Sequence, residues 1–202
     1  MDYIKYVIIL FWLGPIFFLT AAVLRYIDRH VTTPYIVDIA ASSCFLIALT
    51  TELICKNLEK KKPKILENAM HIVYAIAPFC YFTASLCRVL KVNSLATNIM
   101  DLCATILFFT GTNIRFSIEI MKGSYAFICV VSIYWSAHVF FICAFVSYII
   151  DIDNKLGNYF EMISGCFFVI AATIWLLGEI LIRNCGLVLE KDHNLDLIVL
   201  SE

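Results

Sequence analysis

Three acidic residues stand at matching places in a chain that is otherwise mostly apolar. Asp38 and Asp101 are 63 residues apart, and Glu161 follows 60 residues later. An ionised carboxylate inside a membrane is costly unless it faces protein or water, so each of these acids marks a candidate functional site. A ring of acids at one depth would form an electronegative mouth that attracts cations. The spacing therefore offers a cation pathway as one hypothesis.

Each acid also has a candidate partner 13 residues before it. Arg25 precedes Asp38 and Arg88 precedes Asp101 by this distance, and Tyr148 precedes Glu161. The spacing bridges the turn of a helical hairpin, so the earlier side chain can reach the acid on the next helix. We therefore predict three hairpin clamps, the third with a tyrosine hydroxyl as donor, and favour them over an acid ring.

The same helices carry further groups beyond the acids. Seven residues after each acid comes a phenylalanine, which suggests either a hydrophobic constriction that gates a pore or simple packing at the bundle centre. The three residues are Phe45, Phe108 and Phe168. Ionisable residues follow near the far helix ends, either as a cluster or as ordinary charges that snorkel to water. They are Glu52, Arg115 and Glu179.

His138 is a titratable residue expected near the middle of the membrane, at the position that aligns with Pro15 and Pro78. Such a histidine can relay protons or bind a ligand, although a lone histidine more often hydrogen-bonds the neighbouring backbone. The chain has no paired histidines for haem, no cysteine spacing typical of zinc and no catalytic motif. We therefore expect no metal, no cofactor and no catalytic residue.

The elements that position these residues are six long apolar stretches. Apolar residues make up 62% of the 202 residues and charged residues only 15%, against about a quarter charged in soluble domains. Each stretch has about 20 residues, enough for a helix to cross the hydrocarbon layer. They are residues 4–24, 35–55, 69–87, 95–113, 125–149 and 160–182. The chain is thus expected to be an all-α integral membrane protein with six transmembrane helices.

The aligned residues divide the chain into three tandem helical hairpins of about 60 residues. The repeat units are residues 3–57, 66–118 and 125–184 of a single domain over residues 1–202, with a short cytosolic tail at 185–202. Ala21, Ala84 and Ala144 also align, and small residues of this kind allow helices to pack closely. The hairpins are expected to form a pseudo-threefold bundle, with an open sequential arrangement as the alternative.

The distribution of basic residues predicts the orientation. Of the 15 Lys and Arg residues, 10 lie on the side of the N-terminus and 5 on the other. The positive-inside rule then places both termini in the cytosol. No address for a particular compartment is present.

Three functions remain open for such a multi-pass protein of a eukaryotic membrane. The first is a non-enzymatic accessory, scaffold or assembly role, with the bilayer and either a membrane-protein partner or a second copy as partners. The second is a small channel or transporter for a cation, proton or small solute. The third, a lipid-modifying enzyme, rests on His138 and the acids. Nothing indicates nucleic-acid binding.

Overall fold

The computed structural model describes residues 3–27, 32–58, 65–122, 125–150 and 154–184, and these residues form six long α-helices. Each helix contains one of the apolar stretches and extends beyond it, by as much as nine residues at the end of α4. The helices are α1 (Tyr3–Ile27), α2 (Thr33–Leu58), α3 (Ile65–Val89), α4 (Ser94–Lys122), α5 (Tyr125–Ile150) and α6 (Asn154–Asn184). Pro15 and Pro78 lie inside α1 and α3, and both helices continue through them.

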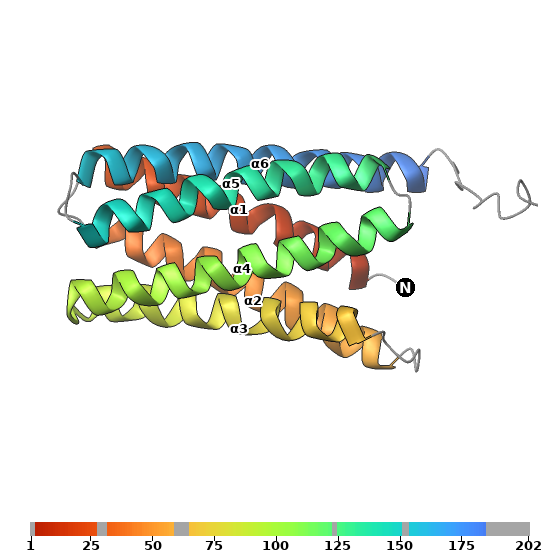
Figure 1. The fold of residues 1–202 in the computed structure, drawn as a ribbon, viewed down its shortest axis with the longest axis horizontal. Coiled ribbons are helices and arrows are strands. Elements are labelled where there is room, and N and C mark those ends of the chain that lie inside the picture. The colour runs from red at the N-terminus through yellow and green to blue at the C-terminus, as the bar shows by residue number, and fades with distance from the viewer. Residues whose placement is uncertain (1–2, 28–31, 59–64, 123–124, 151–153, 185–202) are drawn as a thin grey trace, which may run out of the picture.

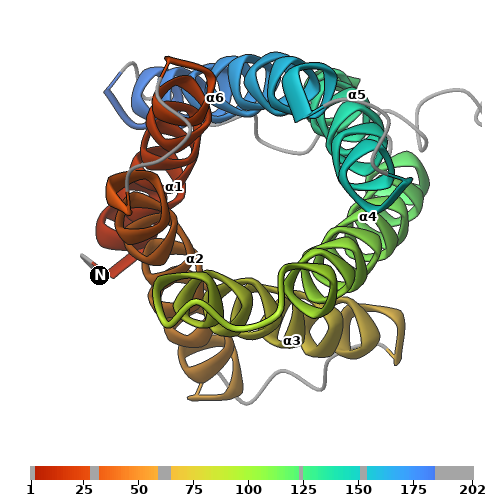
Figure 2. The ribbon, with the colours of Figure 1, turned by 90° about the vertical axis from the view of Figure 1, so that its left-hand side faces the viewer.

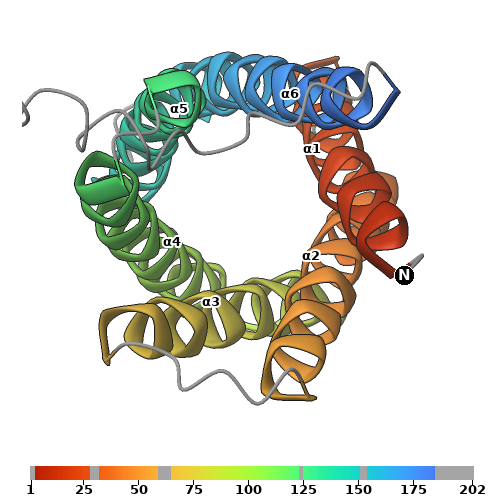
Figure 3. The same cartoon turned by 90° about the vertical axis from the view of Figure 1, so that its right-hand side faces the viewer.

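The helices stand side by side in a ring around one axis (Figures 1 and 2). Each packs against its neighbours in chain order, and α6 packs against α1, which completes the ring. The view from the other end shows the same order (Figure 3). The open sequential arrangement is therefore not the one adopted. We call the end where α1 leads into α2, α3 into α4 and α5 into α6 the acid end.

All six helices are long and apolar enough to cross a membrane, with candidate spans of 22 to 25 residues. Their burial pattern fits such an environment. Large apolar side chains such as Ile47, Phe79 and Ile106 point outward and are about half exposed, whereas charged and polar side chains such as Asp38, Thr105 and His138 are buried inside the ring. Since hydrocarbon cannot solvate polar groups, this pattern is expected for a ring surrounded by lipid.

Small residues allow the neighbouring helices to come close together. Ala21, Ala84 and Ala144 have no exposed surface, in keeping with contacts between helices. Gly165 of α6 faces the backbone of α1, where an added Cβ would lie 3.1 Å from the Cα of Leu19. A larger residue at position 165 would force α6 away from α1, where the ring closes.

The turn between α3 and α4 shows how local sequence positions two of the charged residues. Lys91 has a φ of 56°, a left-handed conformation that ends α3. Asn93 then caps α4, since its side-chain oxygen accepts hydrogen bonds from the backbone N–H groups of Leu95 (2.9 Å) and Ala96 (3.3 Å). The tight turn fixes the register of α3 against α4, which sets Arg88 opposite Asp101.

We predict that Asn93→Ala will lower the free energy of unfolding by about 1 kcal/mol, because two N–H groups at the start of α4 lose their acceptor. Thermal unfolding of the purified protein in detergent measures this change. Asn93→Asp, which keeps the acceptor oxygen, is the matched control and should melt close to the wild type. Equal destabilisation by both variants would contradict a capping role.

Candidate functional site

The three acids gather at one level inside the acid end of the ring. Asp38 on α2 and Asp101 on α4 have no exposed surface, and Glu161 on α6 is 2% exposed. Each lies five to seven residues from the start of its helix, about 10 Å along the axis at 1.5 Å per residue. Charges buried this deeply need partners of opposite charge.

Arg25 on α1 binds two of the acids at once. One guanidinium nitrogen forms an ion pair with Asp38, and Nε donates to Glu161 Oε2 at 2.8 Å. Because α1 packs between α2 and α6, a single side chain joins the three helices. The sequence predicts the first of these pairs and misses the second, which links residues 136 positions apart.

Arg88 holds the third acid and also joins three helices. It forms an ion pair with Asp101 and donates to Asn98 Oδ1 at 2.9 Å, both on α4. Its guanidinium also lies over the ring of Tyr35 on α2, 5.9 Å from the ring centre. We call Arg25, Asp38, Arg88, Asp101 and Glu161 the ionic layer.

Tyr148 completes this level between α5 and α6. Its hydroxyl donates to Asn158 Oδ1 at 2.6 Å, and Asn158 donates in turn to the backbone carbonyl of Arg25 at 3.3 Å. The ring of Tyr148 packs against Gly157, where no Cβ would fit. Tyr148 is also close enough to Glu161 to interact with it. The charged donor to Glu161 is therefore Arg25 on α1, which lies outside the hairpin predicted to contain Glu161.

A polar cavity of ≈ 320 Å³ opens at the acid end, and we call it the vestibule. Parts of the ionic layer form its floor, namely Arg25, Arg88 and Glu161. Within the described residues, the Oδ1 atoms of Asp38 and Asp101 accept no hydrogen bond. These two oxygens lie in the ionic layer but do not line the vestibule, whose charged lining residues among the described ones are Arg25, Arg88 and Glu161.

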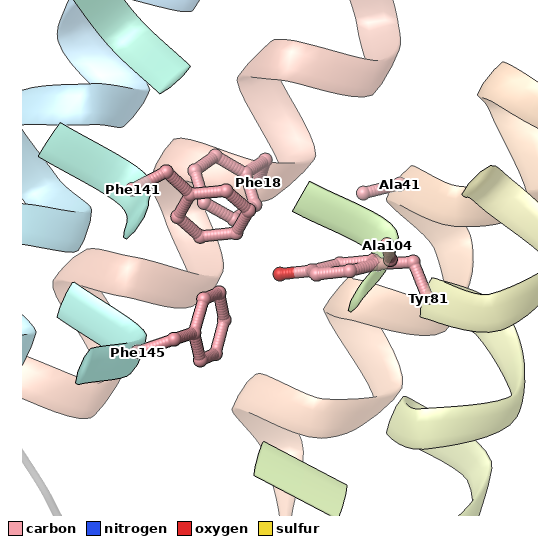
Figure 4. Packing of buried hydrophobic residues seen from close by; sticks show 6 residues of the cluster. All are labelled: Phe18, Ala41, Tyr81, Ala104, Phe141 and Phe145. Atoms are coloured by element: carbon pink, nitrogen blue, oxygen red, sulfur yellow. The ribbon is translucent and has the colours of Figure 1, made fainter. Parts of the chain in front are cut away.

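Three aromatic rings meet below the ionic layer. Phe18, Tyr81 and Phe141 come from α1, α3 and α5, which are not neighbours in the ring, yet their ring centres are 4.7 to 6.2 Å apart. Figure 4 shows these side chains pointing toward one another, with Phe145 beside them. Each lies seven residues inward from Arg25, Arg88 or Tyr148. We call the three rings the aromatic layer.

Sequence reasoning missed this layer, although the signal was present. The three residues occupy one aligned position, three residues after Pro15, Pro78 and His138. The constriction predicted from the sequence lies on the helices that carry the acids. In the structure, the helices between them supply the rings that meet on the axis.

A second cavity of ≈ 100 Å³ lies on the other side of the aromatic layer, and we call it the central cavity. Phe45, Phe108 and Phe168 all line it. Phe45 and Phe108 are 5.9 Å apart, whereas Phe168 packs against Phe18 and His138. The three rings thus form part of the cavity wall, and a gating role for them stays a prediction.

His138 is buried in the wall of the same cavity. Its Nδ1 lies 2.6 Å from the carbonyl oxygen of Tyr134, one turn earlier on α5. A carbonyl only accepts, so Nδ1 carries a proton and Nε2 is an acceptor in the neutral ring. The histidine therefore has the backbone hydrogen bond expected of a lone residue, and it also faces a space that a ligand can occupy.

Arg115 lies at the far end of the central cavity. Its guanidinium stacks over the ring of Trp175 on α6, 5.2 Å from the ring centre. Glu52 is half-buried, and both Glu52 and Arg115 lie within electrostatic range of Tyr74. The side chain of Glu179, the third member of the predicted cluster, lies outside the described residues.

Within the described ranges, no group of three His, Cys, Asp or Glu side chains is arranged to hold a metal ion. The three acids of the ionic layer share their site with two guanidiniums, which compete with any cation. The chemistry of this level is ion pairing and hydrogen bonding.

Comparison with known proteins gives no relative: no family model matches the sequence, and no curated protein and no solved structure matches it either. Function is therefore inferred from the ring, its two cavities and the ionic and aromatic layers.

We predict that Arg25→Gln will destabilise the protein more than Arg88→Gln, because Arg25 compensates two buried carboxylates and Arg88 one. Removing one partner of a buried ion pair costs about 3–5 kcal/mol. Thermal unfolding in detergent compares the two variants.

A double variant tests the shared pairing directly. Adding Glu161→Gln to Arg25→Gln removes one of the two uncompensated charges, so part of the lost stability should return. Simple addition of the two single effects would contradict the contact between Arg25 and Glu161.

Proposed function

We propose that this six-helix membrane protein carries a small solute across the membrane along the axis of its ring. One observation supports this most strongly: residues from all six helices line each of the two cavities, and the ionic layer borders one cavity while the aromatic layer borders the other. A carrier needs a binding space that a thin barrier closes on one side, and transport then requires the barrier to part.

The ionic and aromatic layers form this barrier, and the side-chain contacts within them can change while the helices stay folded. The ionic layer is held by side chains, and Arg25 has two acceptors between which its guanidinium can redistribute. The aromatic layer consists of three rings from three different helices. These rings contact one another through their side chains. Small shifts of α1, α3 and α5 would therefore separate them.

The central cavity favours a carrier over an open cation channel. Its wall is mostly apolar and aromatic, and the charged residue among the described residues that line it is the cation Arg115. An ion pathway requires polar groups or water along its whole length. The acids of the ionic layer are engaged by Arg25 and Arg88, which lowers their attraction for a passing cation.

We also propose the orientation of the protein in the membrane and the division of the chain into three repeat units. With both termini in the cytosol, the vestibule opens to the outer side and Arg115 lies toward the cytosol. The units over residues 3–57, 66–118 and 125–184 would each supply one ring to the aromatic layer and one acid to the ionic layer.

A non-enzymatic accessory role is the second candidate. It is favoured by the ion pairs themselves, since Arg25 joins α1 to α2 and α6, and Arg88 joins α3 to α4. In that case the layers would be a structural lock for a rigid ring. His138 lies inside the ring, away from the lipid-facing surface, which disfavours an enzyme acting on lipids.

We expect vesicles that contain the purified protein to take up small solutes. Phe141→Leu should change the rate of uptake, because the smaller side chain loosens the aromatic layer. Uptake is measured with a panel of potassium, acetate, benzoate and glycerol, by an internal dye or by light scattering. Phe140→Leu is the matched control, since its ring packs against Phe160 and Phe167 away from the axis. Its uptake should equal that of the wild type.

Absence of uptake for every member of the panel, in both the wild type and Phe141→Leu, would reject the carrier and favour the accessory role. A monodisperse, normally melting protein in the same preparation excludes misfolding as the reason. Equal changes in Phe141→Leu and Phe140→Leu would show that the effect does not arise at the aromatic layer.

A further inference from the structure

The central cavity has the size and the wall of a site for one small ring. Its volume of ≈ 100 Å³ is of the order of the ~150 Å³ dry cavity that holds one benzene molecule in another protein. Aromatic side chains from all six helices line it, among them Phe45, Tyr74, Phe108 and Phe168. Neighbouring rings are tilted or edge-on to one another. Such a wall binds a further ring through offset or edge-to-face contacts.

Two prolines bring carbonyl acceptors to this apolar space. Pro15 and Pro78 are fully buried, line the cavity and lie inside α1 and α3. A proline has no N–H, so the carbonyl four residues earlier lacks its usual helical donor. The carbonyls concerned are those of Phe11 and Tyr74, whose side chains line the same cavity. Because residues four apart share a helix face, these two acceptors lie on the cavity side of their helices.

His138 supplies a third acceptor, at the aligned position of α5. It is 4% exposed and lines the cavity. Its Nδ1 donates to the carbonyl oxygen of Tyr134 on its own helix, which leaves Nε2 as an acceptor on the other side of the neutral ring. The three aligned positions each lie three residues before a ring of the aromatic layer. The three acceptors therefore lie at a similar depth, on alternate helices of the ring.

The charges near the cavity disfavour an ionised ligand. Arg115 lines its far end, and both Arg115 and Glu52 lie within electrostatic range of Tyr74. Because these two charges are opposite, this end of the cavity offers no net charge to hold an ion. An ion taken from water into such a space would lose its hydration without gaining a counter-charge, which is strongly unfavourable. An uncharged ligand avoids this cost.

We propose that the central cavity is a binding site for a small uncharged ring compound that donates a hydrogen bond, such as a phenol. Its ring would lie among the aromatic side chains, and its O–H or N–H would reach Nε2 of His138 or one of the two freed carbonyl oxygens. The inference goes beyond the proposed transport, because a neutral ring compound dissolves in lipid and reaches the cavity without being carried. A ligand bound here would stabilise the folded ring in a carrier and in an accessory protein alike.

Equilibrium dialysis of the purified full chain in detergent tests the proposal in the wild type with phenol and benzonitrile. The two probes are similar in size and in hydrophobicity, but phenol donates a hydrogen bond whereas benzonitrile only accepts one. A site with three acceptors should bind phenol roughly tenfold more tightly, because the nitrile has no donor for them. Benzoate and benzylammonium should both bind more weakly than phenol. Protein-free micelles of the same detergent give the background for every probe.

His138→Phe tests the histidine, since this variant keeps an aromatic ring and removes the acceptor. Phenol binding should fall roughly three- to tenfold, while benzonitrile binding stays unchanged. His138→Gln, whose side-chain oxygen can accept a hydrogen bond, should retain part of the preference for phenol. Phe140→Leu alters ring contacts away from the axis and should bind both probes as the wild type does.

Several results would overturn the proposal. Equal binding of phenol and benzonitrile would show that the acceptors play no part, and no binding above the micelle background would show that the cavity takes no ring compound. Tighter binding of benzylammonium would assign the cavity to cations, and tighter binding of benzoate would assign it to anions. An unchanged preference for phenol in folded His138→Phe would remove the histidine from the site. The comparison among probes uses the wild type, so it decides the matter even if His138→Phe fails to fold.

The two proposals fail in different ways. Selective phenol binding without uptake of any solute into vesicles would reject the carrier and keep the ligand site. Uptake of solutes without selective phenol binding would keep a transport function and reject the ligand class proposed for the cavity.

Discussion

The structure depends on the ion pairs among five ionisable side chains that are buried at one level inside the acid end. Three carboxylates and two guanidiniums stand there, and each guanidinium is at most 14% exposed. In such surroundings an uncompensated charge would cost several kcal/mol. The helices that carry these groups must therefore stay adjacent, and the shared use of Arg25 by Asp38 and Glu161 extends this requirement from one hairpin to the junction of α1 with α6.

The aromatic layer and the two cavities follow from this arrangement. With the helix ends held in register, residues seven positions inward from Arg25, Arg88 and Tyr148 reach the axis together. Their rings close the space below the ionic layer, while smaller or tilted side chains deeper in the ring leave the central cavity. A polar space and an apolar space thus lie on either side of one thin barrier, each with its own binding chemistry.

The sequence predicts the six helices well, because length and apolar composition alone decide whether a helix can cross a membrane. It also predicts the contacts of Arg25 with Asp38 and of Arg88 with Asp101, since these cross a short turn. It does not predict the contact of Arg25 with Glu161 or the meeting of Phe18, Tyr81 and Phe141, because these depend on the ring closing. Periodicity describes one helix at a time, whereas closure depends on how all six pack.

The junction of α1 with α6 has a consequence for how the protein is made. Arg25 is inserted into the membrane with the first helix, but one of its two acceptors, Glu161, arrives with the last. Until then the guanidinium must be shielded by Asp38, lipid headgroups or the insertion machinery. The ionic layer can therefore be completed only after α6 has been synthesised.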